Sequence, residues 1–298
     1  MTTKISLALG GGGSKGITHV GVIKALLENG IEIDSIAGTS IGSIVAAIYS
    51  KGSTVEEMID LFKGIDQSKL FSFPFADGPG FLGYRGVKEF LDQALGDVTF
   101  QDLKIKCTII SVDLNTDSVV EMTTGIVKDA ILASIAVPGF FPPQFVDGMT
   151  LVDGGVMDPV PVRSARKMSP GLPVIAVSLS TRILSDAPLT QQPGSIGFNS
   201  LLVNQISRTN LSKTFKVLVD SIDSSSRQVT ELRLQIDQPD IIMRPSVSKI
   251  GLLDPVNIDE MVQLGKEAVE VEIGKINNLK QGFFEKLFRF PASLFGTK

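Results

Sequence analysis

Short apolar runs alternate with amphipathic stretches over residues 5–51. Residues 5–9 are apolar except for Ser6, and residues 31–37 carry three isoleucines and an alanine, so both runs are predicted to be short strands of a buried parallel sheet. Residues 17–29 and 42–51 carry broad apolar surfaces with helical spacing, and Gly30 follows the first of them as a helix-ending residue would. This order of strand, helix, strand and helix predicts an α/β fold around a parallel sheet.

Similar signals continue towards the C-terminus. Thr54 and Glu57 form a capping-box pair for a helix over 54–63. Asp147 and Gly148 are the turn residues of a hairpin predicted over 145–153. The other predicted elements are helices at 87–95, 127–135, 200–235 and 258–279, and strands at 105–112, 119–122, 173–179 and 241–243.

Three segments depart from this alternation. Residues 68–86 hold four phenylalanines among prolines and glycines without a clean period, so they are predicted to be an irregular loop on the core or a flap over a site. Residues 183–200 are predicted to be a loop. No internal repeat or low-complexity linker divides the chain, so we expect one domain over 1–280 and a Phe-rich tail over 281–298.

Composition and charge narrow the function classes. With 43% hydrophobic and 20% charged residues the chain is not an intrinsically disordered one, and its net charge of −4 argues against a nucleic-acid partner. The single cysteine, Cys107, excludes an internal disulfide and a Cys-rich metal site. The single histidine, His19, excludes any mechanism that needs two imidazoles.

The apolar runs are too short for a transmembrane helix or the core of a signal peptide. A cytoplasmic protein is therefore expected. The Phe-rich segments 71–84 and 282–295 are candidates for peripheral membrane contact, or for packing of a loop and a tail helix on the domain. The oligomeric state is left open.

A glycine loop follows the first predicted strand. It contains Gly11, Gly12, Gly13 and Gly16, with Lys15 inside it, and it presents backbone N–H groups at a helix N-terminus. Such amides suit a phosphate or the oxyanion of a tetrahedral intermediate. Spacing of the glycines, with Asp34 further on, also fits a dinucleotide-binding fingerprint, so an oxidoreductase is an alternative.

A second motif, Gly38-Thr-Ser-Ile-Gly42, lies between the second predicted strand and the next helix. This is the context of a nucleophile elbow, in which Ser40 projects from a sharp turn. A serine hydroxyl needs a base. His19 precedes Ser40 inside the first helix and is better explained as a packed residue. The best-placed carboxylate is Asp153, which ends the predicted hairpin and is followed by Gly154 and Gly155.

Taken together, these residues resemble the patatin-like phospholipase family over about residues 5–180. Four blocks occur in the family's order: the glycine loop with His19 and Gly21, the Ser40 motif, the Ala133-Ser-Ile-Ala-Val-Pro138 block, and Asp153-Gly-Gly155. One position departs from the family's pattern, because Asp158 stands where many members carry an asparagine. A carboxylate there is expected to form a different hydrogen bond or to repel Asp153.

The resemblance implies a three-layer α/β/α fold with a mostly parallel central sheet. It also implies a lipid acyl hydrolase of the phospholipase A, lysophospholipase or carboxylesterase type, which needs no metal or other cofactor. Ser40 would be the nucleophile, Asp153 its base, and the amides of Gly11, Gly12 and Gly13 the oxyanion hole. The other motif residues, Lys15, Gly16, Gly38, Gly42, Gly154 and Gly155, would support them. A lipid-binding protein without catalysis is a further alternative.

Overall fold

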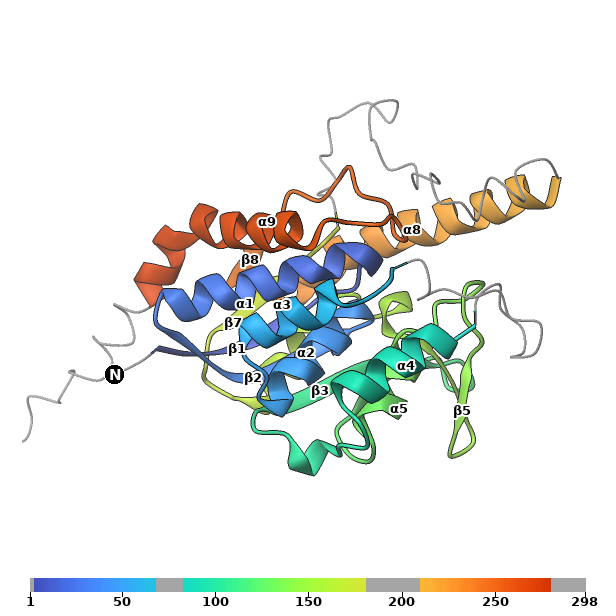
Figure 1. Cartoon of the computed structure of the whole chain (residues 1–298), viewed down its shortest axis with the longest axis horizontal. Coiled ribbons are helices and arrows are strands. Elements are labelled where there is room, and N and C mark those ends of the chain that lie inside the picture. The colour runs from blue at the N-terminus through green and yellow to red at the C-terminus, as the bar shows by residue number, and fades with distance from the viewer. Residues whose placement is uncertain (1–2, 68–82, 181–209, 280–298) are drawn as a thin grey trace, which may run out of the picture.

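The computed structural model describes residues 3–67, 83–180 and 210–279 (Figure 1). Most of the predicted flap over 68–86, the predicted loop over 183–200 and the Phe-rich tail over 281–298 lie outside the described residues. Within the described part of the chain, no helix is long and apolar enough to cross a membrane.

The centre of the fold is a mostly parallel sheet in the order β5-β6-β3-β2-β1-β7-β8. Strands β3, β2, β1, β7 and β8 run parallel, whereas β4 and β6 pair antiparallel with β3, and β5 with β6. The strands are β1 (Thr3–Leu9), β2 (Ile31–Thr39), β3 (Lys106–Asp113), β4 (Ser118–Met122), β5 (Gln144–Val146), β6 (Met149–Asp153), β7 (Val174–Val177) and β8 (Ile241–Met243).

Helices cover both faces of this sheet, which confirms the predicted three-layer architecture. Successive β1 side chains point to opposite faces of the sheet. Leu7 and Leu9 belong to the large core that contains most helices, and Ala8 belongs to a smaller core with α6 and α8. The helices of the large core are α1 (Thr18–Glu28), α2 (Ile41–Lys51), α3 (Val55–Lys63), α4 (Arg85–Ala94), α5 (Val127–Ser134) and α9 (Ile258–Val271). Opposite them are α6 (Val162–Met168) and α8 (Asn210–Asp237).

The local signals read from the sequence were largely confirmed. Thr54 and Glu57 form the capping box of α3, and the hairpin turns at Asp147 and Gly148, both with positive φ. Helix α6 was not predicted, because it is only seven residues long and follows two prolines. The long C-terminal helix predicted over 258–279 is interrupted at Glu272, where α9 ends.

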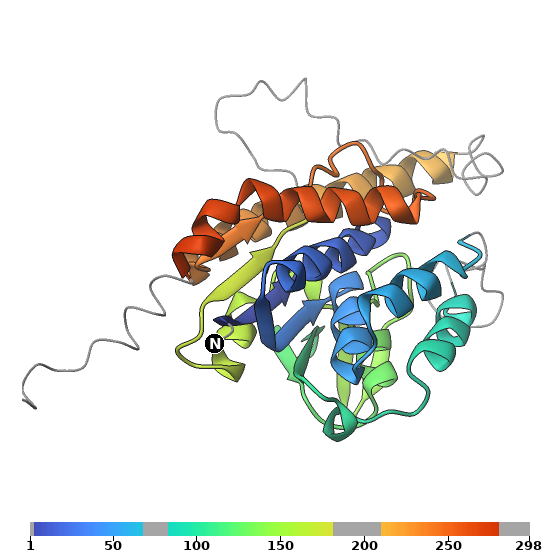
Figure 2. The same ribbon diagram turned by 60° about the vertical axis from the view of Figure 1, so that its left-hand side comes forward.

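Helices α1 and α9 lie side by side, as Figures 1 and 2 both show. Glycines allow this close approach. A Cβ on Gly265 of α9 would lie 2.1 Å from the Thr18 carbonyl oxygen, and one on Gly21 of α1 would lie 1.9 Å from the Val262 carbonyl oxygen. Both distances are far below van der Waals contact, so neither position has room for a side chain.

Gly265→Ala is therefore expected to lower the free energy of unfolding by roughly 1–3 kcal/mol, because the added methyl group overpacks this helix interface. Gly274→Ala is the matched control, since a Cβ there meets nothing within 4 Å, and it should be neutral or slightly stabilising. Urea unfolding of both variants measures the difference. Equal stability of the two would contradict the close packing.

Candidate active site

Ser40 occupies a sharp turn between β2 and α2. Its φ of 55° lies in the left-handed region that residues other than glycine rarely adopt, at a cost of roughly 1–3 kcal/mol. Gly38 and Gly42 make the turn possible: a Cβ on Gly38 would lie 2.4 Å from the Gly42 carbonyl oxygen, and one on Gly42 would lie 2.2 Å from that of Leu9. The turn thus has the predicted geometry of an elbow.

Neighbouring segments fix the backbone around Ser40. The Ser40 amide donates a 2.9 Å hydrogen bond to Ser134 Oγ, and the Ser43 hydroxyl donates to the Ser40 carbonyl oxygen at 2.6 Å. The Thr39 hydroxyl donates to the carbonyl oxygen of Asp158 at 2.8 Å. These bonds hold the strained turn in one conformation.

Strand β3 brings Asp153 next to this turn, although 113 positions separate Asp153 from Ser40 in the chain. Ile110 of β3 pairs with Thr39 of β2, and the next residue, Ser111, pairs with Asp153 of β6. The two strand ends therefore meet on adjacent residues of β3.

The Asp153 carboxyl group is almost fully buried. One oxygen, Oδ1, accepts a 2.7 Å hydrogen bond from the Gly155 amide. Burial raises the pKa of Asp153 to about 6, while the Ser40 hydroxyl and the Gly155 amide lower it. The other oxygen, Oδ2, is buried and has no hydrogen-bond partner among the described residues.

The glycine loop lies beside Ser40 and lines the same cavity. Its Gly11 amide donates to the Pro159 carbonyl oxygen at 3.0 Å, so Gly11 does not have the free N–H that the sequence analysis expected. The amides of Gly12 and Gly13 donate to no protein acceptor in the described part of the chain. Gly13 must be glycine, because its φ is 58° and a Cβ would lie 2.0 Å from the Leu252 carbonyl oxygen.

His19 is hydrogen-bonded to the backbone just before the glycine loop. Its Nε2 lies 2.8 Å from the carbonyl oxygen of Gly10, which can only accept, so this nitrogen carries the proton. Burial lowers the pKa of His19 to about 4. The imidazole is therefore neutral and packed, as the sequence analysis expected.

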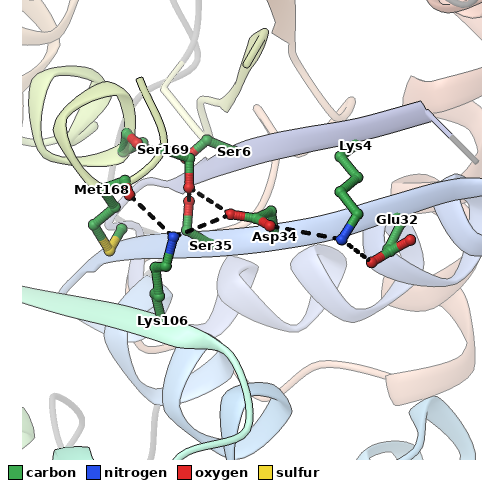
Figure 3. A network of polar contacts seen from close by, with 9 residues as sticks. Lys4, Ser6, Glu32, Asp34, Ser35, Lys106, Met168 and Ser169 are labelled. Carbon is green, nitrogen blue, oxygen red and sulfur yellow. Dashed lines mark hydrogen bonds and ion pairs between the residues drawn. The ribbon is translucent and has the colours of Figure 1, made fainter. Parts of the chain in front are cut away.

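Asp34 lies away from the glycine loop, in the network of Figure 3. Its carboxylate accepts a 2.7 Å hydrogen bond from Ser169 and lies 3.5 Å from Lys106 and 3.8 Å from Lys4. Asp34 lies five positions before Thr39, the last residue of β2, which is roughly 16 Å along a strand. Asp34 therefore cannot bind the ribose of a dinucleotide held at the loop. The oxidoreductase alternative then rests on the glycine spacing alone.

Of the two alternatives expected for Asp158, the structure shows the first, a polar contact with a residue other than Asp153. The buried carboxylate of Asp158 lies 3.3 Å from Arg233 of α8, whose other partner is Asp237. Burial raises the pKa of Asp158 to about 6, against the attraction of Arg233. The carboxylate that replaces the asparagine of many relatives thus attaches α8 to the segment next to Asp153.

A single cavity of about 820 Å³ contains Ser40, Asp153 and the glycine loop. Large apolar side chains line much of it, among them Ile44, Phe62, Val87, Phe90, Phe140 and Phe141. A cavity of this size and lining suits an apolar chain. Tyr84, the last residue of the predicted membrane-contact segment 71–84, is buried and donates to the Pro142 carbonyl oxygen. Residues 71–82 and 282–295 lie outside the described residues.

The model of the patatin-like phospholipase family matches residues 7–166. This range contains the glycine loop, Ser40 and Asp153, and it covers more than half of the chain. The chain belongs to the patatin-like phospholipase family. Membership accounts for the four sequence blocks and for their meeting at one end of the sheet.

Relatives of this patatin-like chain include an uncharacterised NTE-family protein of Mycobacterium bovis, 35% identical over 59% of this chain and 49% of its own length. A lysophospholipase NTE1 of Coccidioides immitis is 28% identical over 92% of this chain. This chain spans about half of the length of the first protein and 18% of the second. In fold, it is similar to VipD of Legionella pneumophila, with a TM-score of 0.55 and 14% identity over 93% of this chain and 67% of that one.

Sequence analysis missed one wall of the cavity. Residues Ser221, Asp223 and Arg227 of α8 line it, together with the segment 248–256 before α9. No motif marks these residues. The sequence predicts a helix over 200–235 but gives no sign that this helix lines a site.

Proposed function

We propose that this chain is a serine hydrolase that cleaves the carboxylic ester of a phospholipid or lysophospholipid with a Ser40–Asp153 dyad. The observation that carries the proposal is the pairing of a strained serine with a buried carboxyl group of raised pKa, both opening on an apolar cavity. Family membership supports the same reaction class.

In the first half of the reaction, Ser40 Oγ attacks the ester carbonyl carbon and its proton passes to Asp153. The carbonyl oxygen becomes an oxyanion, which the amides of Gly12 and Gly13 would stabilise. The intermediate then collapses, the carbon–oxygen bond to the alcohol breaks, and the alcohol leaves with the proton from Asp153. An acyl group remains on Ser40.

Water completes the cycle. Asp153 takes a proton from the water molecule as its oxygen attacks the acyl carbon. When the second intermediate collapses, Ser40 Oγ leaves and recovers the proton, and the free acid is released. Asp153 must be ionised at the start of each half-reaction.

Labelling with a fluorophosphonate probe tests this proposal directly. We expect a single adduct on the peptide that carries Ser40, identified by mass spectrometry, and much slower labelling in Asp153→Asn. Ser40→Ala should give no adduct. An adduct on another serine, or ester hydrolysis that persists in fully labelled protein, would overturn the assignment.

A further inference from the structure

The cavity around Ser40 has two chemically different sides. Its apolar side comes from α2, α3, α4 and the segment after α5, with Phe62, Phe90 and Phe141 as its largest residues. On the other side, Ser221, Asp223, Ser226 and Arg227 of α8 line the same cavity. We call Lys15 and this α8 group the polar arm.

Within the described part of the chain, Lys15 is a cation without a hydrogen-bond or ion-pair partner. Its side chain lines the cavity beside the glycine loop, and its ammonium group makes no hydrogen bond or ion pair with any described residue. The ammonium group is partly removed from water, and this burial lowers the pKa of Lys15. A desolvated cation is costly unless an anion lies next to it.

Arg227 supplies a second cation, on the same side of the cavity. It forms an ion pair through one terminal nitrogen with Asp223, one turn earlier on α8. Its other N–H groups donate to no described residue. The second carboxylate near Lys15, Asp254, accepts from the Gly251 amide. Both carboxylates thus have partners, whereas Lys15 and part of the Arg227 guanidinium do not.

We propose that Lys15 and Arg227 bind the phosphate group of the ester substrate, while its acyl chain occupies the apolar side and its ester carbonyl lies at Ser40. This inference rests on the proposed function. Guanidinium and ammonium groups together with serine hydroxyls are the donors that proteins use for phosphate oxygens. The arrangement gives a reason why an acyl ester with a phosphate head group should be preferred over a neutral one.

The test compares two esters with the same acyl chain, a lysophosphatidylcholine and a monoacylglycerol, in identical detergent micelles. The measured quantity is the ratio of their kcat/KM values. Lys15→Met and Arg227→Gln should each lower this ratio by roughly 10- to 100-fold, the effect of losing one hydrogen bond to a charged group. Ser40 attacks both esters and forms the same acyl-enzyme from each. A loss of reactivity at Ser40 should therefore lower both kcat/KM values by the same factor and leave their ratio unchanged.

Arg85→Gln is the matched control. Arg85 also forms an ion pair with a carboxylate one turn away on its helix, Glu89, but it is exposed and outside the cavity. The ratio should not change in this variant. Arg227→Lys keeps the charge and should retain part of the preference.

Different outcomes separate this inference from the proposed function. If the wild-type protein cleaves neither ester, the proposed function fails. If it cleaves both and the ratio is the same in the wild-type and the two variants, only the phosphate site is overturned. A second experiment adds inorganic phosphate or glycerophosphocholine as an inhibitor of monoacylglycerol cleavage. Inhibition by glycerophosphocholine that weakens in Lys15→Met supports a head-group site. Inhibition by inorganic phosphate alone contradicts it.

Discussion

Ser40→Ala is expected to lower kcat for ester hydrolysis by roughly 10⁴- to 10⁶-fold, the loss seen when the nucleophile of a serine hydrolase is removed. The neighbouring hydroxyls of Thr39 and Ser43 already donate to backbone carbonyl oxygens. The substitution should leave the fold intact, because alanine retains the Cβ that is already accommodated at a φ of 55°. Ester hydrolysis followed by titration of the released acid measures the effect.

Ser224→Ala is the control for this variant. Ser224 is exposed on α8 and does not line the cavity around Ser40, so its removal should leave kcat unchanged. Wild-type turnover in Ser40→Ala, with the same thermal stability, would mean that another nucleophile does the chemistry or that water attacks the ester directly.

Asp153→Asn is expected to lower kcat by roughly 10²- to 10⁴-fold, because an amide cannot accept the Ser40 proton. The variant should also change the pH profile. Since only ionised Asp153 acts as the base and its pKa is about 6, kcat/KM of the wild-type protein should rise about tenfold per pH unit below 6 and level off above it. In Asp153→Asn this acid limb should disappear.

Asp158→Asn is a demanding control for the pH profile. Asp158 is also buried, and its pKa is also about 6, but its carboxylate contacts Arg233 and does not line the cavity. The acid limb should therefore persist in Asp158→Asn. If the limb moves with Asp158 and not with Asp153, the assignment of the base is wrong.

The same raised pKa should appear in the stability of the protein. Folding raises the pKa of Asp153 from 3.8 to about 6, so the buried group favours its protonated form. Below pH 3.8 it costs nothing, and the penalty of ionising it in the folded state grows as the pH rises to about 6. At pH 8, Asp153→Asn should be more stable than the wild-type protein by up to about 3 kcal/mol, a value that follows from the size of the shift.

Urea unfolding at pH 4 and at pH 8 checks this effect. The advantage of Asp153→Asn should be near zero at the lower pH and largest at the higher one. An inactive variant that gains stability would identify Asp153 as a residue kept for function at the expense of stability.

The chain by itself determined the layers, the order of the elements and the candidate residues. The run 5–9 is apolar except at Ser6 and is buried throughout, and β2 is buried at every position from Ser35 to Thr39, because both strands are covered on both faces. The glycines around Ser40 and after Asp153 identify close backbone approaches, which only glycine permits. These are local constraints, so they leave a local signature.

Only the tertiary structure decided which distant residues lie close together. Pairing on β3 brings Asp153 to Ser40, and the Gly11 amide is occupied by Pro159, a residue 148 positions away. The partners of Asp158 and the place of Arg227 depend on how α8 packs across the sheet. These contacts join segments that are far apart in the chain and meet through the sheet, so they have no fixed spacing. A periodic pattern of apolar residues predicts a helix or strand but does not predict which segment packs against it.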